Sequence, residues 1–505
     1  MRKIQLPILL AAFCTAFSLL ATASPHISFD VESPAETEEI VSEIAPQRNT
    51  SAMYSETLKG AGTAEDPFLI SCADDFLYLA GQVNAGNTDY ASAYYMQSAD
   101  IDLSDTAFVP VGTKKHPFTG SYEGANFRIS FKGSYSGNTF GIFGYAQAAD
   151  FYNMDILLDA DVRYNDTASS DTAVLCAGGV CGYYKVANSA TNEVSGCSVS
   201  GKITVYNDRD ATSAGGIFGY LEARTVRYGF VHVTDCTMSA DLDISSTLSP
   251  FVGGLSGYVK EEGKGKSRFE RCYIDGSISA VGIADTCYKI YVGGVAGWMS
   301  IDPDGWSIWE SMPELYADTP SAVNIRDCVV ASPKLYAEIV TSPGSSKALI
   351  GWLSGGASED VVVENCYYLK NDTIVPNGKK LSITEIASPE KLYSFEFLTK
   401  TLHFDMSSLW TWKEGESVSL RFEKMCILAH RYDSKLVVKT LGCDSGMIAV
   451  AYRSSEGKVL QIEWREYTGE MMTFDIPQTD SETPLISVFL IGPDGLMPLA
   501  GTKKL

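Results

Sequence analysis

One motif occurs six times between about residue 140 and residue 375, and its period limits the possible folds more than any other feature of the chain. Each copy opens with glycine, two small or apolar residues, glycine and an aromatic residue. It closes with an apolar residue, two polar residues, a cysteine and alternating apolar positions. The openings are GIFGY (141–145), GGVCGY (178–183), GGIFGY (215–220), GGLSGY (253–258), GGVAGW (293–298) and LIGW (349–352). The closings are FYNMDI (151–156), VSGCSV (194–199), VTDCTM (233–238), FERCYI (269–274), IRDCVV (325–330) and VENCYY (363–368). Repeats of this length predict a stack of similar units, each burying its apolar face against the next.

The spacing inside the closings predicts short strands joined by corners. An apolar residue stands two positions after the cysteine, which is strand alternation with both side chains facing inward. Another stands three positions before it, so the two polar residues between them predict a corner. The opening glycines fit a second corner, where glycine can take positive φ and leaves room for the next coil. The pattern therefore predicts a mainly β, parallel solenoid with coils about 4.8 Å apart.

When the closings are aligned on the cysteine, the residues at that position are expected to stack as one structural column through the interior of the solenoid. Exported proteins can form disulfides, but parallel stacked side chains hold their Cβ atoms slightly too far apart for a relaxed bridge. Cysteine also serves as a small buried apolar group, and a methionine in the same column supports that role. We therefore expect free, buried thiols; away from the column, Cys426 and Cys443 are the first pair to test as a disulfide. The column is Met154, Cys197, Cys236, Cys272, Cys328 and Cys366.

The aromatic residue that ends each opening predicts a second column. Stacking for stability is the favoured interpretation, and a sugar-binding aromatic strip is the alternative. Its members are Tyr145, Tyr183, Tyr220, Tyr258, Trp298 and Trp352.

The N-terminal residues predict export. Residues 1–23 have the charged start, short apolar run and small-residue cleavage site of a signal peptide. The Ser-, Thr-, Glu- and Pro-rich residues 24–58 predict a disordered acidic linker. No other stretch is long enough for a transmembrane segment. We expect a secreted or cell-surface protein, and the formal net charge of −23 disfavours nucleic acid as a partner.

The repeats resemble those of the GLUG-motif proteins of bacterial cell surfaces. The stretch from GAGTAEDPFLIS (60–71) to the first repeat is similar to the family's entry segment, and residues 397–422 resemble its closing segment. This resemblance implies a right-handed β-helix-like body at residues 59–424 in a secreted or surface-displayed protein, including adhesin-like proteins. Some relatives carry a zinc protease domain with a His-Glu-x-x-His motif, which the five histidines here do not form. That activity is therefore not expected.

Both ends of the predicted solenoid are followed by other elements. Apolar residues at helical spacing in residues 74–86 predict an amphipathic helix that caps the open end of the stack. After residue 424 the repeat ends. Residues 425–505 contain five strand-like segments separated by turn signals, which predict a small antiparallel β-sandwich.

A long insertion in the fifth repeat is the candidate ligand-binding site. Insertions in solenoids form loops on one face, and such loops often bind. Ring faces pack against sugars and acids accept hydrogen bonds from hydroxyls, so this composition suits a glycan. A loop that packs its own aromatics on the solenoid is the other interpretation. The candidate residues are Trp306, Trp309, Tyr316, Asp302, Asp304 and Glu310.

No catalytic motif, metal site or cofactor site is predicted. The expected function is a non-enzymatic, adhesin-like scaffold that binds an extracellular glycan or a host or cell-surface protein. The alternative is a carbohydrate-active enzyme, either a polysaccharide lyase or a glycoside hydrolase, because β-helices host both. The sequence specifies neither the ligand nor the oligomeric state.

Overall fold

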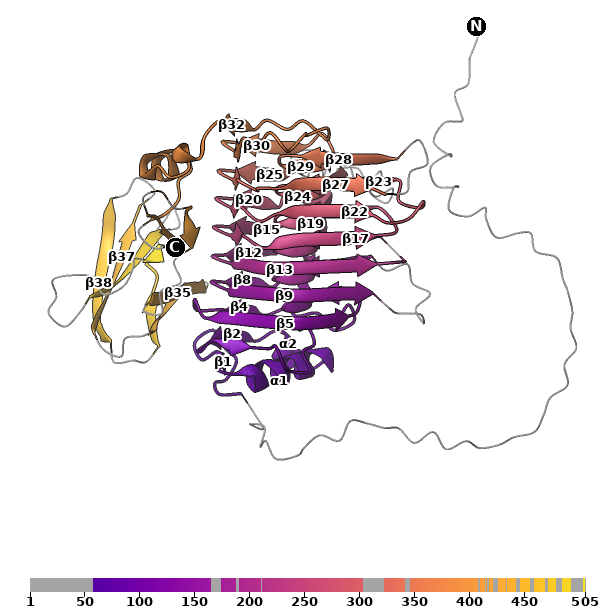
Figure 1. The fold of residues 1–505 in the computed structure, drawn as a ribbon. Helices are drawn as coiled ribbons and strands as arrows, with labels where there is room; N and C mark the ends of the chain where they lie inside the picture. Colours follow the sequence, from indigo (N-terminus) through magenta and orange to yellow (C-terminus); the bar gives the residue numbers. More distant parts are fainter. Residues whose placement is uncertain are drawn as a thin grey trace, which may run out of the picture. The chain divides into compact units, whose positions relative to one another are not determined.

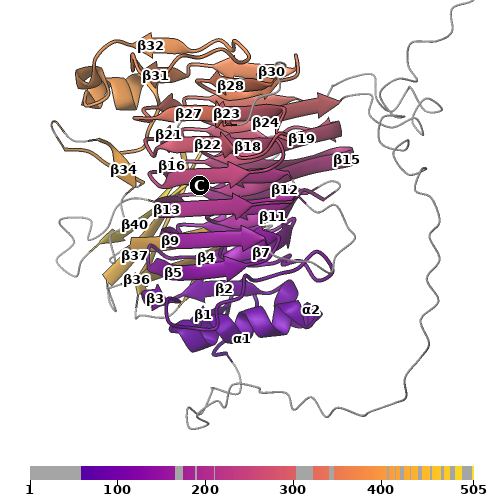
Figure 2. The same ribbon diagram turned by 45° about the vertical axis from the view of Figure 1, so that its right-hand side comes forward.

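Successive coils of the chain stack into a parallel β-solenoid (Figure 1). The computed structural model describes residues 58–504 apart from 165–173, 188–189, 210, 303–321, 341–345, 407–408, 414, 416, 421–425, 433, 442–445, 455–457, 468–470, 478–483 and 492–502. Strands at equivalent places in neighbouring coils pair in parallel, and Figure 2 shows β5, β9 and β13 in succession along the stack. The predicted fold class is confirmed. In the described part of the chain, no helix has the length and apolar character needed to cross a bilayer.

The strands of each coil belong to four parallel ladders. The first contains β1 (Phe68–Ile70), β2 (Tyr94–Gln97), β4 (Ser121–Glu123), β8 (Asp150–Tyr152), β12 (Thr191–Ser195), the end of β15 (Phe218–Thr234), β20 (Arg268–Glu270), β25 (Val323–Arg326) and β30 (Val361–Glu364). The second contains β3 (Ile101–Asp102), β5 (Arg128–Ser136), β9 (Asp155–Tyr164), β13 (Ser198–Asn207), β16 (Thr237–Met238), β17 (Asp241–Ser246), β21 (Tyr273–Ile274), β22 (Ile278–Gly282), β26 (Val329–Val330), β27 (Leu335–Ile339), β31 (Tyr367–Leu369) and β32 (Thr384–Ile386).

The other two ladders carry the glycine-rich openings. The third contains β6 (Thr139–Phe140), β10 (Leu175–Gly178), β14 (Thr212–Gly215), β18 (Pro250–Gly253), β23 (Lys289–Gly293) and β28 (Lys347–Gly351). The fourth contains β7 (Phe143–Gln147), β11 (Cys181–Lys185), the start of β15, β19 (Ser256–Gly265), β24 (Ala296–Asp302) and β29 (Ser354–Ala357).

The opening glycines are needed for space rather than for positive φ. A Cβ atom built on Gly254 would lie 2.0 Å from the carbonyl oxygen of Gly294, its counterpart in the next coil. The left-handed glycines found among the described residues do not include Gly254 or Gly294. The prediction that these glycines admit the neighbouring backbone is therefore confirmed, and the prediction of positive φ is wrong here.

The cysteine column runs through the buried interior. Its five cysteines are at most 2% exposed, and Met154 precedes them in the same buried core. The thiol of Cys236 donates to the carbonyl of Val194 in the preceding coil at 3.6 Å. The described cysteines are all free thiols. Cys443 lies outside the described residues and the side chain of Cys426 is not described, so that pair stays a prediction.

Four tyrosines form a ladder of parallel rings. The ring centroids of Tyr145 and Tyr183 lie 4.7 Å apart, and those of Tyr183 with Tyr220 and of Tyr220 with Tyr258 lie 4.9 Å apart. The planes differ by no more than 6°. Both faces of Tyr183 and of Tyr220 are therefore covered by neighbouring rings, which leaves these two no face for a sugar.

The placement of Trp352 in this aromatic column is wrong. Gly351 pairs with Gly293, and Gly356 pairs with Trp298. Trp352 thus follows the first glycine of its opening, and Gly356 occupies the aromatic position. Trp352 stacks on Tyr368 instead, with centroids 4.1 Å apart. The sixth copy keeps a glycine followed by an aromatic residue, but at a different offset from the other copies, so its sequence fits the motif in a register that the strand pairing does not adopt.

The predicted helical cap is present at the first coil. It consists of α1 (Ala73–Asn84) and the short α2 (Thr88–Ala91). One face of α1 joins the solenoid core, and the ring of Phe76 meets those of Tyr122 and Phe143 edge-on, with centroids 6.4 and 6.5 Å apart. The buried face is Phe76, Leu79, Ala80 and Val83.

A small antiparallel β-sandwich follows the repeats, as predicted. The intervening segment contains η3 (Pro389–Lys391), η4 (Phe397–Thr401), β33 (Trp410–Thr411) and β34 (Ser419–Leu420). One sheet of the sandwich has the order β35 (Cys426–Tyr432), β36 (Lys435–Leu441), β39 (Met472–Asp475). The other has the order β38 (Val459–Tyr467), β37 (Gly446–Arg453), β40 (Leu485–Ile491), β41 (Lys503–Lys504). Their facing apolar side chains, including Val438, Val450 and Val488, form one buried core.

Removing the main contact of the cap should destabilise the solenoid. Phe76→Ala is expected to lower the free energy of unfolding by about 3–5 kcal/mol, because it opens a cavity between α1 and the first coils. Gly81→Ala is the control on the same helix. Gly81 is exposed, with open space where a Cβ would lie, so this change should add about 0.5–1 kcal/mol. Urea unfolding followed by circular dichroism measures both, and an unchanged Phe76→Ala midpoint would contradict the role of the cap.

Thiol reactivity should separate one described cysteine from the rest. In native protein without reductant, Cys72 is expected to react with a thiol reagent, because it is exposed. The buried column cysteines should react only after denaturation. Mass spectrometry of labelled peptides gives the result, and a column cysteine that is already oxidised in denatured protein would contradict the packing role.

Candidate functional site

The strands of the first ladder end at residues in the left-handed backbone region. In six coils φ lies between 50° and 65° at the residue directly before the interior column. Glycine, asparagine and aspartate adopt this conformation readily, whereas an arginine loses about 1–2 kcal/mol. The predicted corner is therefore confirmed, and Arg271 is its most strained member. The six residues are Asn153, Gly196, Asp235, Arg271, Asp327 and Asn365.

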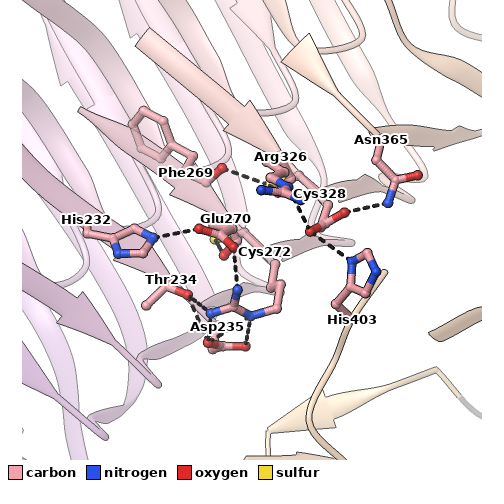
Figure 3. Close-up of polar contacts among 12 residues, drawn as sticks. His232, Thr234, Asp235, Phe269, Glu270, Cys272, Arg326, Cys328, Asn365 and His403 are labelled. Atoms are coloured by element: carbon pink, nitrogen blue, oxygen red, sulfur yellow. Dashed lines mark hydrogen bonds and ion pairs between the residues drawn. The ribbon is translucent and has the colours of Figure 1, made fainter. Parts of the chain in front are cut away.

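Contacts of the Arg271 side chain offset this strain. Its Nε donates to Asp235 Oδ1 at 3.0 Å and its Nη2 to Asp235 Oδ2 at 2.8 Å (Figure 3). The same guanidinium donates to Thr234 Oγ1 at 2.6 Å and to Glu270 Oε1 at 2.5 Å. Trp410 Nε1 donates to Asp235 Oδ1 at 2.9 Å. The buried carboxylate of Asp235 is thus fully paired, which marks this cluster as structural.

Glu270 is held as a carboxylate. His232 Nε2 lies 2.9 Å from Glu270 Oε2, and the charge of Arg271 lies on its other side. The hydrogen bond with His232, and then the charge of Arg271, lower the pKa of Glu270 to about 2. A group that is ionised at every physiological pH cannot act as a general acid.

The corner acid of a later coil is also paired. Asp327 is buried, with His403 Nδ1 at 3.2 Å and Arg326 Nε at 3.5 Å from its Oδ2. Asn365 donates its amide to Oδ1 of the same carboxylate (Figure 3). Asp327, like Asp235, therefore stabilises the stack rather than facing a ligand.

A pocket of about 270 Å³ opens beside these clusters on the outer face of β20, β25 and β30. Strand register places Arg268 opposite Asn324, and Arg326 between Glu270 and Glu364. Arg326 Nε lies 3.9 Å from Glu364 Oε2. The pocket is lined by Arg268, Phe269, Glu270, Asn324, Ile325, Arg326, Val362 and Glu364.

Arg268 is the charged side chain of this pocket that has no ion pair among the described residues. Its guanidinium lies over the ring of Phe230, 5.2 Å from the centroid. It forms no ion pair with any carboxylate of the described residues. It leaves a fork of N–H donors open to a ligand.

Glu270 cannot supply the proton that glycoside hydrolysis needs in this pocket. Glu270 and Glu364 stand two strand spacings apart, about 9.6 Å along the stack, which is close to the separation used by inverting enzymes. One of the pair must carry a proton, however, and the pKa of Glu270 is lowered to about 2. Of the described residues, no group of three or more histidine, cysteine or acidic side chains could hold a metal ion.

The carboxyl with the strongest upward shift lies inside the solenoid. Glu261 on β19 is fully buried and pairs in register with Ala223 and Ile301, which are also buried. The Ser267 amide donates to its Oε1 at 3.2 Å, and burial raises the pKa of Glu261 to about 8. Such a pKa suits a general acid, but an enclosed side chain cannot meet a polymeric substrate.

Most of the predicted ligand-binding residues lie outside the described residues. Trp306, Trp309, Tyr316, Asp304 and Glu310 belong to residues 303–321, and they stay predictions. Asp302 is the last residue of β24, and its side chain is not described.

The insertion and the pocket are nevertheless linked through the chain. The insertion leads from β24 into β25, the strand that carries Asn324 and Arg326. Sequence reasoning missed the pocket, although charged or polar residues two and four positions before the cysteine were a visible signal for it.

A scan against protein-family models gives no match for this chain, and a search of curated proteins finds no significant relative.

Removing the buried carboxyl should change how stability depends on pH. Unfolded Glu261 ionises near its ordinary value of 4.5, whereas the folded protein keeps it protonated up to about pH 8. Stability from this group is therefore complete below pH 4.5, falls as the pH rises, and is lost above about 8. Glu261→Gln should raise the free energy of unfolding at pH 8 by on the order of a few kcal/mol and flatten this slope. Urea unfolding from pH 4 to 9 checks it, with the exposed Glu359→Gln as control; an unchanged slope would contradict the buried state of Glu261.

Proposed function

We propose that this chain is a secreted or surface-displayed, non-enzymatic scaffold of the adhesin type that binds an extracellular glycan or a cell-surface protein. The observation that carries the proposal is the outward-facing pocket on β20, β25 and β30. It combines open donors with an acceptor on a rigid wall, where neighbouring strands hold each side chain at a fixed spacing.

The side chains of the pocket suit a ligand rich in hydroxyl groups. Arg268 and Asn324 can donate, and Glu364, with 63% of its side chain exposed, can accept. Val362 adds an apolar surface between them. Alternating donors and acceptors around a small apolar area is the usual composition of a sugar or peptide subsite.

The sequence of the insertion at residues 303–321 suits the same kind of ligand. It carries Trp306 and Trp309, and the described chain resumes just before β25, one of the strands that line the pocket. Aromatic side chains are the groups that pack on sugar faces and on protein hot spots. The inner rings of the tyrosine ladder, whose faces are covered, would not serve this purpose.

Export and surface display are supported by the sequence. Residues 1–23 have the pattern of a signal peptide, and residues 60–424 resemble GLUG-motif proteins. The carbohydrate-active enzyme is the weaker proposal, since Glu270, with its pKa lowered to about 2, cannot serve as the proton donor in this pocket.

Binding to a panel of polysaccharides, read as both retention and release of reducing ends, tests this function. Retention without new reducing ends is expected. Arg268→Ala should weaken the retained glycan about tenfold or more, the usual loss for a charged hydrogen bond. The double variant Trp306→Ala/Trp309→Ala tests the insertion in the same assay.

Arg163→Ala is the matched control, because this exposed arginine on β9 pairs with Asp161 away from the pocket. Release of reducing ends would favour the enzyme. If no glycan is retained, adhesion of the labelled protein to cells tests the protein-binding form. Binding that survives the Arg268 and tryptophan changes would remove this face from the proposal.

A further inference from the structure

β38 is an edge strand with an unusual sequence. In the described part of the sandwich it pairs only with β37, so one row of its backbone N–H and C=O groups has no strand beside it. Edge strands of soluble proteins commonly carry short, charged or interrupted sequences that discourage pairing. β38 spans nine residues and is largely exposed. Its exposed apolar side chains are Val459 (52%), Leu460 (44%), Ile462 (49%) and Trp464 (55%).

Two of these apolar side chains lie on the outer face of their sheet. Trp464 pairs with Ala449 and Ile462 with Ala451 on β37. The alternate residues of β37, such as Val450, belong to the core between the two sheets. Strand alternation therefore directs Trp464 and Ile462 away from that core.

The inner face of the same strand carries opposite charges. Arg465 donates to Glu463, and its Nη1 donates to the Thr473 carbonyl at 2.8 Å. The Arg465 guanidinium also lies over Phe474, 4.5 Å from the ring centroid. Glu463 and Arg465 therefore place a negative and a positive charge two residues apart along the open edge. A strand that pairs there must carry the opposite charge at each facing position, because like charges would repel.

We infer that β38 is an interface that pairs with β38 of a second copy of this chain. In an antiparallel pair centred on Trp464, the two tryptophans face each other, and Glu463 of each copy stands opposite Arg465 of the other. Cross-strand aromatic and opposite-charge pairs both stabilise sheets. Shifting the centre to Glu463 or to Arg465 places identical charges opposite each other, which disfavours those registers.

This pairing satisfies the free backbone edge from residue 461 to residue 467 and covers part of the exposed Trp464 ring at once. A twofold axis through the Trp464 pair makes the contact isologous, so it closes after two copies and does not propagate into a fibre. The resulting particle carries two solenoids. The inference does not depend on the ligand-binding role of the pocket, although a dimer would bind a surface through two sites at once.

Sedimentation equilibrium of the full chain tests the interface. A dimer is expected, and Trp464→Lys should give monomers. Glu463→Arg alone, or Arg465→Glu alone, should weaken dimerisation about tenfold or more, because both symmetric ion pairs become repulsive. Circular dichroism and thermal unfolding establish that each variant is folded.

Mixing the two charge variants provides the decisive control. Each lacks its own Glu463–Arg465 pair, yet in the mixed dimer every arginine of one chain faces a glutamate of the other. A heterodimer from two weakly associating variants therefore shows pairing between chains, because a purely internal role of the pair would not be rescued. A monomeric wild-type chain, a dimer unaffected by Trp464→Lys, or the absence of a heterodimer would overturn the inference.

Discussion

Hydrogen bonding between successive coils, residue for residue, is the constraint on which the rest of this structure depends. Over ten consecutive residues β9 pairs with β13 without a register shift. Each side chain then lies one strand spacing from its counterpart in the next coil, so its size and charge must suit two neighbours. The thiol column, the parallel tyrosine rings and the close approach of Gly254 to Gly294 all follow from this single spacing.

The same spacing explains why the acids at the corners are not active-site groups. Asp235 is followed one coil later by Arg271, which pairs with it, and Asp327 is held by Arg326, His403 and Asn365. Contacts of this kind occupy the carboxylate oxygens and fix the side chain in place. The pocket is lined instead by residues that precede the corner, among them Arg268 and Asn324, three positions before Arg271 and Asp327.

Much of the fold could be predicted because the spacing of residues within each repeat indicates where the strands run and where the chain turns. Alternation around Cys236 gives the inward face, and the polar pair before it gives the corner. The cap was predictable from the helical spacing of Phe76 and Val83. The position of Trp352 was not, because a degenerate copy offers two glycines with which to align it.

The candidate site was less predictable for a physical reason. The contact between Trp410 and Asp235 joins residues 175 positions apart, and no periodicity encodes it. The burial of Glu261 depends on which of the two alternating faces of β19 turns inward, in a stretch of the chain that lies between the opening and closing motifs. The pocket likewise arises from several coils together, so no single repeat contains enough of it to be noticed.

The tyrosine ladder has an optical consequence. Four parallel phenol rings less than 5 Å apart are close enough for their electronic transitions to couple. Burial raises the pKa of each of these phenols, so the rings stay neutral, and their spectrum depends on spacing rather than on titration. The near-ultraviolet circular dichroism of this stack should therefore show whether adjacent coils remain in contact.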